Sequence, residues 1–140
     1  MRCQICVSLS SFDACRMTSI AQFGVGGGNT VAAKLIELGY NPLCQIETIS
    51  RYSDLIHSSL VAETTHELDE ANRQTDTTEE DGTSATIAAY TWTFDKDGRI
   101  TGVTSPDGTT DYVYHNNGQL VDADHSYQSD EDNEYDEHDV

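Results

Sequence analysis

Basic residues are scarce in this chain. Only seven Lys and Arg stand against 25 Asp and Glu in 140 residues, which gives a formal net charge of −18 at pH 7. Nucleic-acid phosphates and anionic membrane surfaces both attract proteins through basic side chains. The composition therefore argues against nucleic acid and membrane surfaces as partners and predicts a solvated, acidic protein surface.

Long apolar runs are also missing. No stretch approaches the roughly eighteen apolar residues that span a bilayer, so membrane insertion is not expected. Met1–Met17 holds a short apolar run broken by Ser and Asp13, which makes a poor secretory signal. Hydrophobic residues make up 36% of the sequence, and such a chain can bury only a thin core.

Catalytic motifs are absent from the sequence. It contains neither a Gly-x-Ser-x-Gly elbow nor a His-Glu-x-x-His pair, and its five histidines share no common motif. Paired carboxylates carry little information in a chain this acidic. We therefore predict a protein that is not an enzyme, with no catalytic residues and no cofactor.

Three of the four cysteines lie within the first 15 residues. Cys3 and Cys6 have the two-residue gap of a zinc knuckle or a redox pair. A zinc site needs a second pair of ligands, whereas Cys15 stands alone and the first histidine is His57. We interpret these cysteines as incidental residues of a poorly ordered leader and predict no metal site.

A glycine run at 24–28 precedes a pattern of helical spacing. The spacing predicts a short helix over Asn29–Leu38, which ends at Gly39. The residues that would share its apolar face are Val31, Leu35 and Leu38. A phosphate-binding loop is disfavoured, because the P-loop Lys-Ser/Thr and a preceding buried strand are both missing. Residues 1–39 are therefore predicted to form a leader with one short helix.

The stretch Tyr90–Leu120 has the periodicity of β-strands. Aromatic residues at every second position predict a strand with one face buried: Tyr90, Trp92 and Phe94. The expected turns lie at Asp97-Gly98, Asp107-Gly108 and Asn117-Gly118. A β-bulge at Gly102 would bring Ile100 and Val103 onto the same face.

The same pattern recurs along the chain. Asp95 and Gly98-Arg99-Ile100 match His115 and Gly118-Gln119-Leu120 at a step of 20 residues. Asp69–Arg73 and Asp81-Gly82-Thr83 match Asp95–Arg99 and Asp107-Gly108-Thr109, both at a step of 26 residues. Tyr40–Ile46 fits the same frame, and Tyr135-Asp136 begins a further, degenerate unit. Repeats are thus predicted over residues 40–121.

Residues 122–140 form an acidic tail. Such a block of like charges repels itself and tends towards disorder. Carboxylates at high density invite comparison with calcium sites, and Asp95-Lys96-Asp97-Gly98 begins like a calcium loop. The later ligands and the terminal Glu are missing, so loose attraction of counter-ions is the preferred interpretation.

These residues resemble a known family. The order Tyr/Phe-Asp-x-x-Gly-Arg-Ile/Leu, then Asp-Gly-Thr, then Tyr-x-Tyr is similar to the YD repeat of RHS proteins. The residues that carry the repeat motif are Phe94, Asp95, Gly98, Arg99, Ile100, Asp107, Gly108, Thr109, Tyr112, Tyr114, Gly118 and Leu120. The flanking units depart from the motif, with Leu68 for the aromatic residue, His115 for Asp and Cys44 for Gly.

The resemblance implies a mainly β fold in which antiparallel hairpins stack edge to edge into a curved sheet. RHS proteins are large bacterial surface or secreted proteins, related in repeat type to teneurin ectodomains. Their repeats form a shell around a C-terminal toxin, or a surface stalk that contacts carbohydrate or another cell. The resemblance therefore implies a structural repeat segment, located outside the cell or on its surface.

The partners implied are further YD repeats or a second copy paired through open sheet edges. Two alternatives stay open. One is a carbohydrate-binding module that uses exposed aromatic side chains, namely Trp92, Tyr112 and Tyr114. The other is a truncated, non-functional fragment whose leader replaced upstream repeats.

Overall fold

The computed structural model describes residues 5–9, 12–13, 16–24 and 32–132. All regular elements in this part of the chain are β-strands, and no helix occurs there. The predicted mainly antiparallel β fold is confirmed. In chain order the strands are β1 (Ile5–Leu9), β2 (Phe12–Asp13), β3 (Arg16–Met17), β4 (Ser19–Gly24), β5 (Lys34–Tyr40), β6 (Ile46–Tyr52), β7 (Leu60–Leu68), β8 (Gln74–Asp81), β9 (Thr86–Phe94), β10 (Ile100–Ser105), β11 (Gly108–Tyr114), β12 (Leu120–His125) and β13 (Glu131–Asp132).

The chain divides into two compact units. The first comprises Met1–Glu67 and Thr78–Ile87, and the second comprises Leu68–Thr77 and Ala88–Val140. In the first unit, β1, β4, β5, β6 and β7 pair antiparallel in that order, and β2 pairs with β3. In the second unit, β9 to β13 pair antiparallel in chain order. Each of these strands therefore hydrogen-bonds to strands that are near it in sequence.

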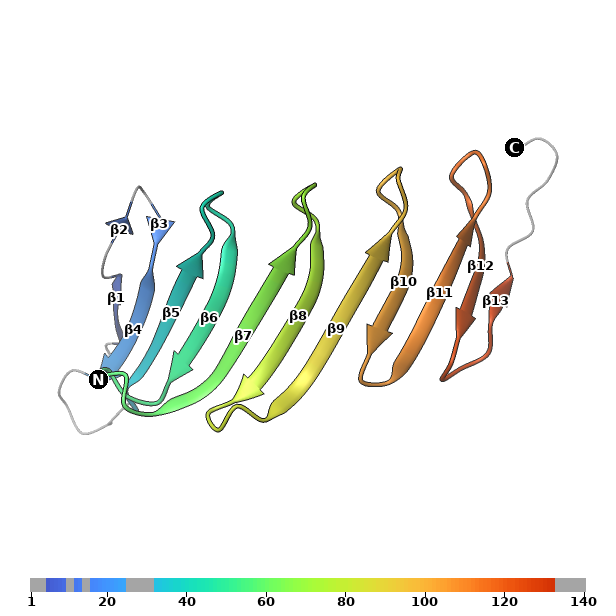
Figure 1. Ribbon diagram of the computed structural model, residues 1–140. Coiled ribbons are helices and arrows are strands. Elements are labelled where there is room, and N and C mark those ends of the chain that lie inside the picture. Colours follow the sequence, from blue (N-terminus) through green and yellow to red (C-terminus); the bar gives the residue numbers. More distant parts are fainter. Residues whose placement is uncertain (1–4, 10–11, 14–15, 25–31, 133–140) are drawn as a thin grey trace. The chain divides into compact units, whose positions relative to one another are not determined.

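The second unit contains the stretch with the strongest strand periodicity. Its strands β9 to β12 are joined by short turns at both ends (Figure 1). The three turns include Asp97-Gly98, Asp107-Gly108 and Asn117-Gly118, where the sequence predicts them. Gly98, Gly108 and Gly118 all have a positive φ, a backbone conformation that residues other than glycine rarely adopt.

A β-bulge interrupts the pairing of β9 with β10. Ile100 pairs with Phe94 and Val103 with Trp92, and the register shifts between Ile100 and Gly102. Because Phe94 and Trp92 lie two residues apart on β9, their side chains and those of their partners share one face. The bulge therefore brings Ile100 and Val103 onto the same side, as predicted.

Few side chains are fully buried. Among the described residues the buried ones are Leu35, Ala62, Ala123, Thr64 and Thr110. Tyr90 is 39% exposed, so the aromatic face of β9 is less covered than the alternation of its aromatic residues predicts. The sheet depends on half-buried side chains and on hydrogen bonds between neighbouring strands rather than on a deep core.

The predicted helix over Asn29–Leu38 is wrong where the structure describes it. Lys34–Tyr40 is strand β5, which pairs with β4 and with β6. Spaced apolar residues in a short segment fit a helix or a strand equally well. The strand forms because the backbone of this segment pairs with β4 on one side and with β6 on the other. Asn29 to Val31 lie outside the described residues.

The sheet extends beyond the predicted repeat boundaries. Ser19–Gly24, within the predicted leader, forms β4 and pairs with β1 and β5. The alternative of a truncated fragment would instead require a leader that makes no contact with the sheet. At the other end, Asp122–His125 belongs to β12 and Glu131–Asp132 to β13. Residues 133–140 of the acidic tail, with Tyr135, lie outside the described residues, as do Cys3 and Cys15. The part of the chain that the structure describes has no helix able to cross a membrane.

Candidate functional site

Five turns of the protein share one backbone geometry. They begin at Asn41, Asp69, Asp81, Asp95 and His115. The first residue of each turn donates its N–H to the carbonyl oxygen four residues later, and its carbonyl accepts from the N–H three residues later. These N···O distances are 2.8–3.1 Å. The matches at steps of 20 and 26 residues therefore correspond to equivalent turns at residues 69, 95 and 115.

The fourth residue of each turn has positive φ. These φ angles are 70° at Cys44, 63° at Asn72, 64° at Ser84, 85° at Gly98 and 91° at Gly118. Glycine adopts this conformation without a steric cost, and Asn tolerates it better than most residues. Cys44 and Asn72 thus occupy the glycine place that the sequence alignment assigns to them.

The side chain of the first residue holds the turn closed. In four of the turns it is Asn or Asp, and its Oδ1 accepts two backbone N–H groups, two and four residues later, at 2.8–3.1 Å. These donated hydrogen bonds, with Arg73 and Arg99 in two cases, lower the pKa of Asp69 and Asp95. The pKa of Asp81 is lowered chiefly by the hydroxyl of Thr83. Aspartate is therefore selected for these positions as an acceptor of backbone hydrogen bonds.

Arginine at the fifth position joins each of two turns to the next. Arg73 Nε donates to Asp69 Oδ2 at 2.7 Å, and its Nη1 reaches the carbonyl of Asp95 at 3.2 Å. Its guanidinium carbon lies 4.5 Å from the centre of the Phe94 ring. Stacking of a guanidinium on an aromatic face is favourable. One arginine thus binds its own turn at residue 69 and the aromatic residue and carbonyl of the turn at residue 95.

The same arrangement recurs one repeat further on. Arg99 Nε donates to Asp95 Oδ2 at 2.7 Å, its Nη1 lies 3.4 Å from the carbonyl oxygen of His115, and its guanidinium carbon lies 4.8 Å from the Tyr114 ring centre. Tyr114 in turn donates its hydroxyl to the carbonyl of Ile100 at 2.7 Å. We call this set the turn ladder. Its members are Asp69, Arg73, Phe94, Asp95, Arg99 and Tyr114.

The outer turns at residues 41 and 115 lack the arginine of the turn ladder, although Arg16 stacks on Tyr40, the residue before the turn at 41, at 5.2 Å. Gln45 and Gln119 stand at the arginine position there. In the turn at residue 41, Asn41 Nδ2 donates to Gln45 Oε1 at 2.9 Å, so a neutral pair replaces the ion pair. The role of arginine across two repeats was missed at the sequence level. The available signal was arginine four residues after each ladder aspartate.

The remaining motif residues lie in the turn between β10 and β11, at the other end of β10 from the turn at residue 95, or along the strands. Asp107 and Gly108 form the tight turn between β10 and β11, and the N–H of Thr109 donates to Ser126 Oγ at 2.7 Å. The sequence pattern matches this turn with the one at Asp81. Both turns join two strands of a hairpin, as the match predicts, but their backbone geometries differ. Leu120 pairs with Tyr114 across β11 and β12.

The three residues predicted to contact sugar make different contacts in the structure. Trp92 stacks on Tyr90 with ring centres 6.1 Å apart and an angle of 17° between the planes. Tyr112 is half-buried in β11, and Tyr114 carries the Arg99 guanidinium on its ring. Tyr90 was missed, although its place two residues before Trp92 puts both rings on one face.

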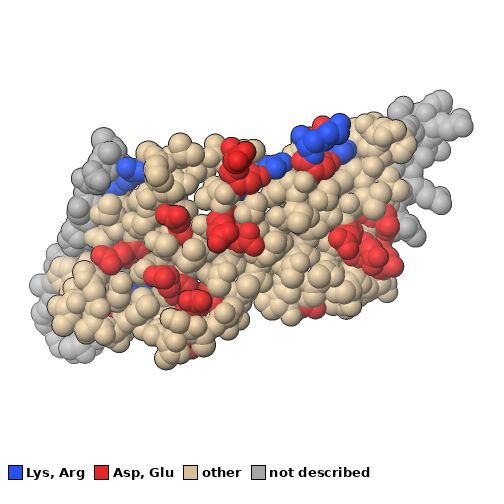
Figure 2. Space-filling view, in the orientation of Figure 1, with Lys and Arg blue, Asp and Glu red and all other residues tan. Residues whose placement is uncertain are grey.

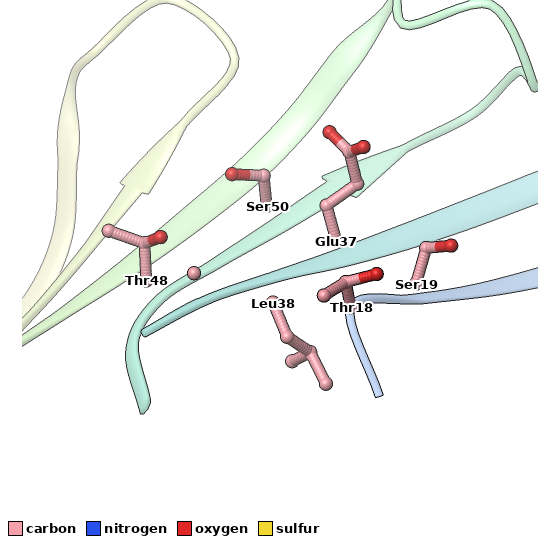
Figure 3. A pocket seen from close by; sticks show the side chains of 7 residues that line it. Thr18, Ser19, Glu37, Leu38, Thr48 and Ser50 are labelled. Atoms are coloured by element: carbon pink, nitrogen blue, oxygen red, sulfur yellow. The ribbon is translucent and has the colours of Figure 1, made fainter. Parts of the chain in front are cut away.

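A shallow depression of about 420 Å³ lies over β4, β5 and β6 in the first unit (Figure 3). Its lining is mostly polar, and Glu37 and Ser50 on paired strands contribute to it. Ser50 donates its hydroxyl to Glu63 at 2.7 Å, while His57 contacts Glu37 at 3.2 Å. Neither contact places an imidazole on a hydroxyl, which a serine nucleophile requires. Within the described residues no three His, Cys, Asp or Glu gather as metal ligands.

Consecutive hairpins closed by equivalent turns define a β-hairpin repeat protein. Residues 94–126 match the model of the family described as RHS Repeat, which supports the resemblance of the chain to RHS-repeat proteins. The matched segment contains Phe94, Asp95, Arg99 and Tyr114, the second half of the turn ladder. No curated protein matches the chain.

Acidification should weaken the turns. The pKa values of Asp69, Asp81 and Asp95 are lowered from the ordinary value of 3.8. Their contribution to stability is complete above that value and is lost as pH falls through the lowered folded-state pKa. We expect the thermal midpoint to fall steeply below about pH 4, as measured by circular dichroism melts from pH 7 to 2.5.

Asp95→Asn is the matched control for this acid transition. The amide oxygen can accept the same backbone hydrogen bonds, as that of Asn41 does, but it does not titrate. The variant should be less stable at pH 7, because it loses the Arg99 ion pair, and should lose less stability on acidification. A loss equal to that of the wild type would contradict the assignment of the transition to these carboxylates.

Proposed function

We propose that this chain is a structural wall segment of an RHS-like secreted or cell-surface protein and is not an enzyme. The observation that carries the proposal is the turn ladder, in which each arginine joins consecutive repeats. The charged side chains of the repeated motif bind one hairpin to the next. A wall built in this way extends by addition of further hairpins.

The distribution of aromatic side chains supports an architectural role. Phe94 and Tyr114 receive the guanidinium groups of Arg73 and Arg99, so these rings serve contacts within the protein. Few side chains are buried, which is expected where each hairpin packs mainly against its neighbours. The partners proposed are further YD repeats or a second copy, added through unpaired strand edges.

The acidic surface opposes such association at low ionic strength. On the face shown in Figure 2, acidic side chains are spread widely and basic side chains are few. With a formal net charge of −18, molecules repel one another over a Debye length of about 10 Å at 0.1 M salt. Repulsion within the chain opposes folding in the same way.

Raising NaCl from about 0.05 M to about 1 M should therefore raise the thermal midpoint and promote self-association together. Circular dichroism melts and multi-angle light scattering after size exclusion measure the two effects. Calcium should do no more than magnesium at equal ionic strength, because the effect is screening. A protein that stays monomeric at all salt concentrations would contradict association through open edges. Stabilisation by micromolar calcium alone would indicate a specific site.

The secreted or cell-surface location is tested separately. An antibody against the chain should detect it in the culture medium or on intact cells of the native host. Detection confined to the cell interior, with a cytosolic enzyme as the lysis control, would contradict this part of the proposal and leave the structural role open.

A carbohydrate-binding module is the second candidate, favoured by the Tyr90–Trp92 stack. Tyr90 is 39% exposed, and two near-parallel rings on one face resemble a platform on which a sugar ring could stack. Glycan-array binding followed by calorimetry tests this candidate. Trp92→Ala should abolish binding and Tyr112→Ala should leave it intact. Absence of glycan binding by the wild type would remove this candidate.

A further inference from the structure

His125 occupies an unusual position in β12. Its side chain is 8% exposed, and Nδ1 lies 3.0 Å from the Thr110 hydroxyl on the neighbouring strand β11. The Tyr127 ring lies 5.5 Å from the imidazole, centre to centre. Nε2 is buried and has no hydrogen-bond partner among the residues that the structure describes. A buried polar atom without a partner costs stability, so this geometry is unfavourable for the side chain as it stands.

A charged group near Nε2 belongs to strand β13. Glu131 Oε1 lies 4.0 Å from Nε2, and the Glu131 side chain is 65% exposed. This distance is too long for a hydrogen bond but falls within reach of a change in the Glu131 rotamer. A partner for the buried nitrogen is therefore available from the strand that covers β12.

Other carboxylates surround this edge. Asp130 accepts the backbone N–H of His125 at 3.2 Å, and Asp111 on β11 pairs with Asp124 on β12. The negative charge of Asp130, followed by burial, raises the pKa of Asp124, and Asp122 and Asp111 add to the effect. Like charges opposite one another on paired strands are destabilising. The edge thus carries repulsion at neutral pH, and the cation of His125 would offset it.

We propose that His125 and Glu131 form a pH-responsive latch that holds β13 on β12. A neutral imidazole carries one N–H, whereas the protonated ring carries two and is a donor at both nitrogens. Histidine side chains change charge between about pH 5 and 8. In mild acid, Nε2–H donates to Glu131, Nδ1–H donates to the Thr110 hydroxyl, and β13 is held in place. At neutral pH the Glu131 contact is lost.

The latch controls access to a strand edge. β13 pairs with Asp122 and Ala123 of β12, and it occupies the side of β12 that another strand would use. An uncovered edge is a template for pairing with a further strand. The inference goes beyond the proposed wall function, because it assigns to this edge a sealed state in acid and an accessible state at neutral pH.

Hydrogen exchange measured by mass spectrometry on the full chain tests the latch. Exchange of the segment 120–132 is compared at pH 5.5 and pH 7.5, after correction for the intrinsic pH dependence of exchange. We expect protection to be about two- to fivefold higher at pH 5.5, the range for a partly exposed ion pair. Glu131→Gln, on an exposed side chain, should remove this difference without unfolding the protein.

Glu37→Gln is the matched control. It removes the carboxylate of another His–Glu pair, that with His57, in which both side chains are partly exposed. It should leave the pH response of segment 120–132 intact. A response that survives Glu131→Gln would overturn the latch and assign the effect to the carboxylates alone. Lower protection at pH 5.5 than at pH 7.5 would also overturn it, because burial would then oppose the histidine cation more than Glu131 favours it.

Nuclear magnetic resonance gives an independent readout. The His125 ring signals, assigned from a His125→Gln spectrum, should differ at pH 5.5 between Glu131→Gln and the wild type. Identical ring signals in the two proteins would mean that Glu131 does not interact with the protonated ring, and the latch would be wrong.

Discussion

Gly108→Ala should lower the free energy of unfolding by about 3 kcal/mol, a large effect for a single substitution. Gly108 has a φ of 145°, a conformation almost restricted to glycine. An added Cβ would also clash with Ser126 Oγ and lie 3.1 Å from Tyr127 Cδ1. The two costs add, because the backbone cannot relax without moving the segment that pairs with Thr109. Thermal melts should show a midpoint about 10 °C lower.

Substitutions at Gly98 separate the two costs. Its φ is 85°, but within the described residues the only atom within 4 Å of an added Cβ is Arg73 Nη1, at 3.9 Å, so Gly98→Ala should cost only the backbone strain of about 1 kcal/mol. Gly98→Asn should cost less, because Asn72 occupies the equivalent place in the turn at residue 69 with a φ of 63°. Equal destabilisation by Gly108→Ala and Gly98→Ala would show that the contact with Ser126 is unimportant.

Arg99→Ala should destabilise the protein by about 1–2 kcal/mol. The arginine side chain is 29% exposed and contributes an ion pair to Asp95 and a stacking contact to Tyr114. Its long hydrogen bond to the carbonyl of His115 adds a third contact. Urea unfolding measures the loss. Arg99→Lys should recover only part of it, since an ammonium group cannot bind the carboxylate and lie flat on the ring in the same way.

The segment that loses protection against hydrogen exchange distinguishes a ladder from an isolated ion pair. In Arg99→Ala, hydrogen exchange should increase in the following turn at 115–119, not only in the turn at 95–99. In Arg73→Ala the increase should reach the turn at 95–99. Lys96→Ala is the control, because Lys96 is 89% exposed and contacts only Asp97 at 3.7 Å among its described charged neighbours. Exchange that changes only in the turn carrying the substitution would contradict coupling between repeats.

The turns could be predicted because their chemistry is local. Asp95 Oδ1 and the N–H groups that it binds lie within five residues of one another, and the left-handed place is marked by glycine at Gly98. The β-bulge at Gly102 could be predicted for the same reason, since two apolar residues three apart must otherwise lie on opposite faces. Such features depend on the residues next to them in the chain.

The role of arginine was not predicted, because its partners lie in another repeat. Arg99 reaches the carbonyl of His115, 16 residues away, and the ring of Tyr114. Alignment of the repeats shows that arginine recurs, but it does not show that the next turn comes within reach of the guanidinium. That distance is set by the spacing of paired strands.

Local chemistry specifies which segments turn and which extend, because the hydrogen bonds close within each turn and the side chains alternate along each strand. The strand at Lys34–Tyr40 follows from its neighbours instead, because its spaced leucines fit either element and the strands on both sides supply its hydrogen bonds. The contact of Tyr90 with Trp92 and the buried place of His125 near Glu131 likewise depend on the folded sheet. Contacts between strands depend on register and on which hairpins are neighbours, and a local pattern of residues specifies neither.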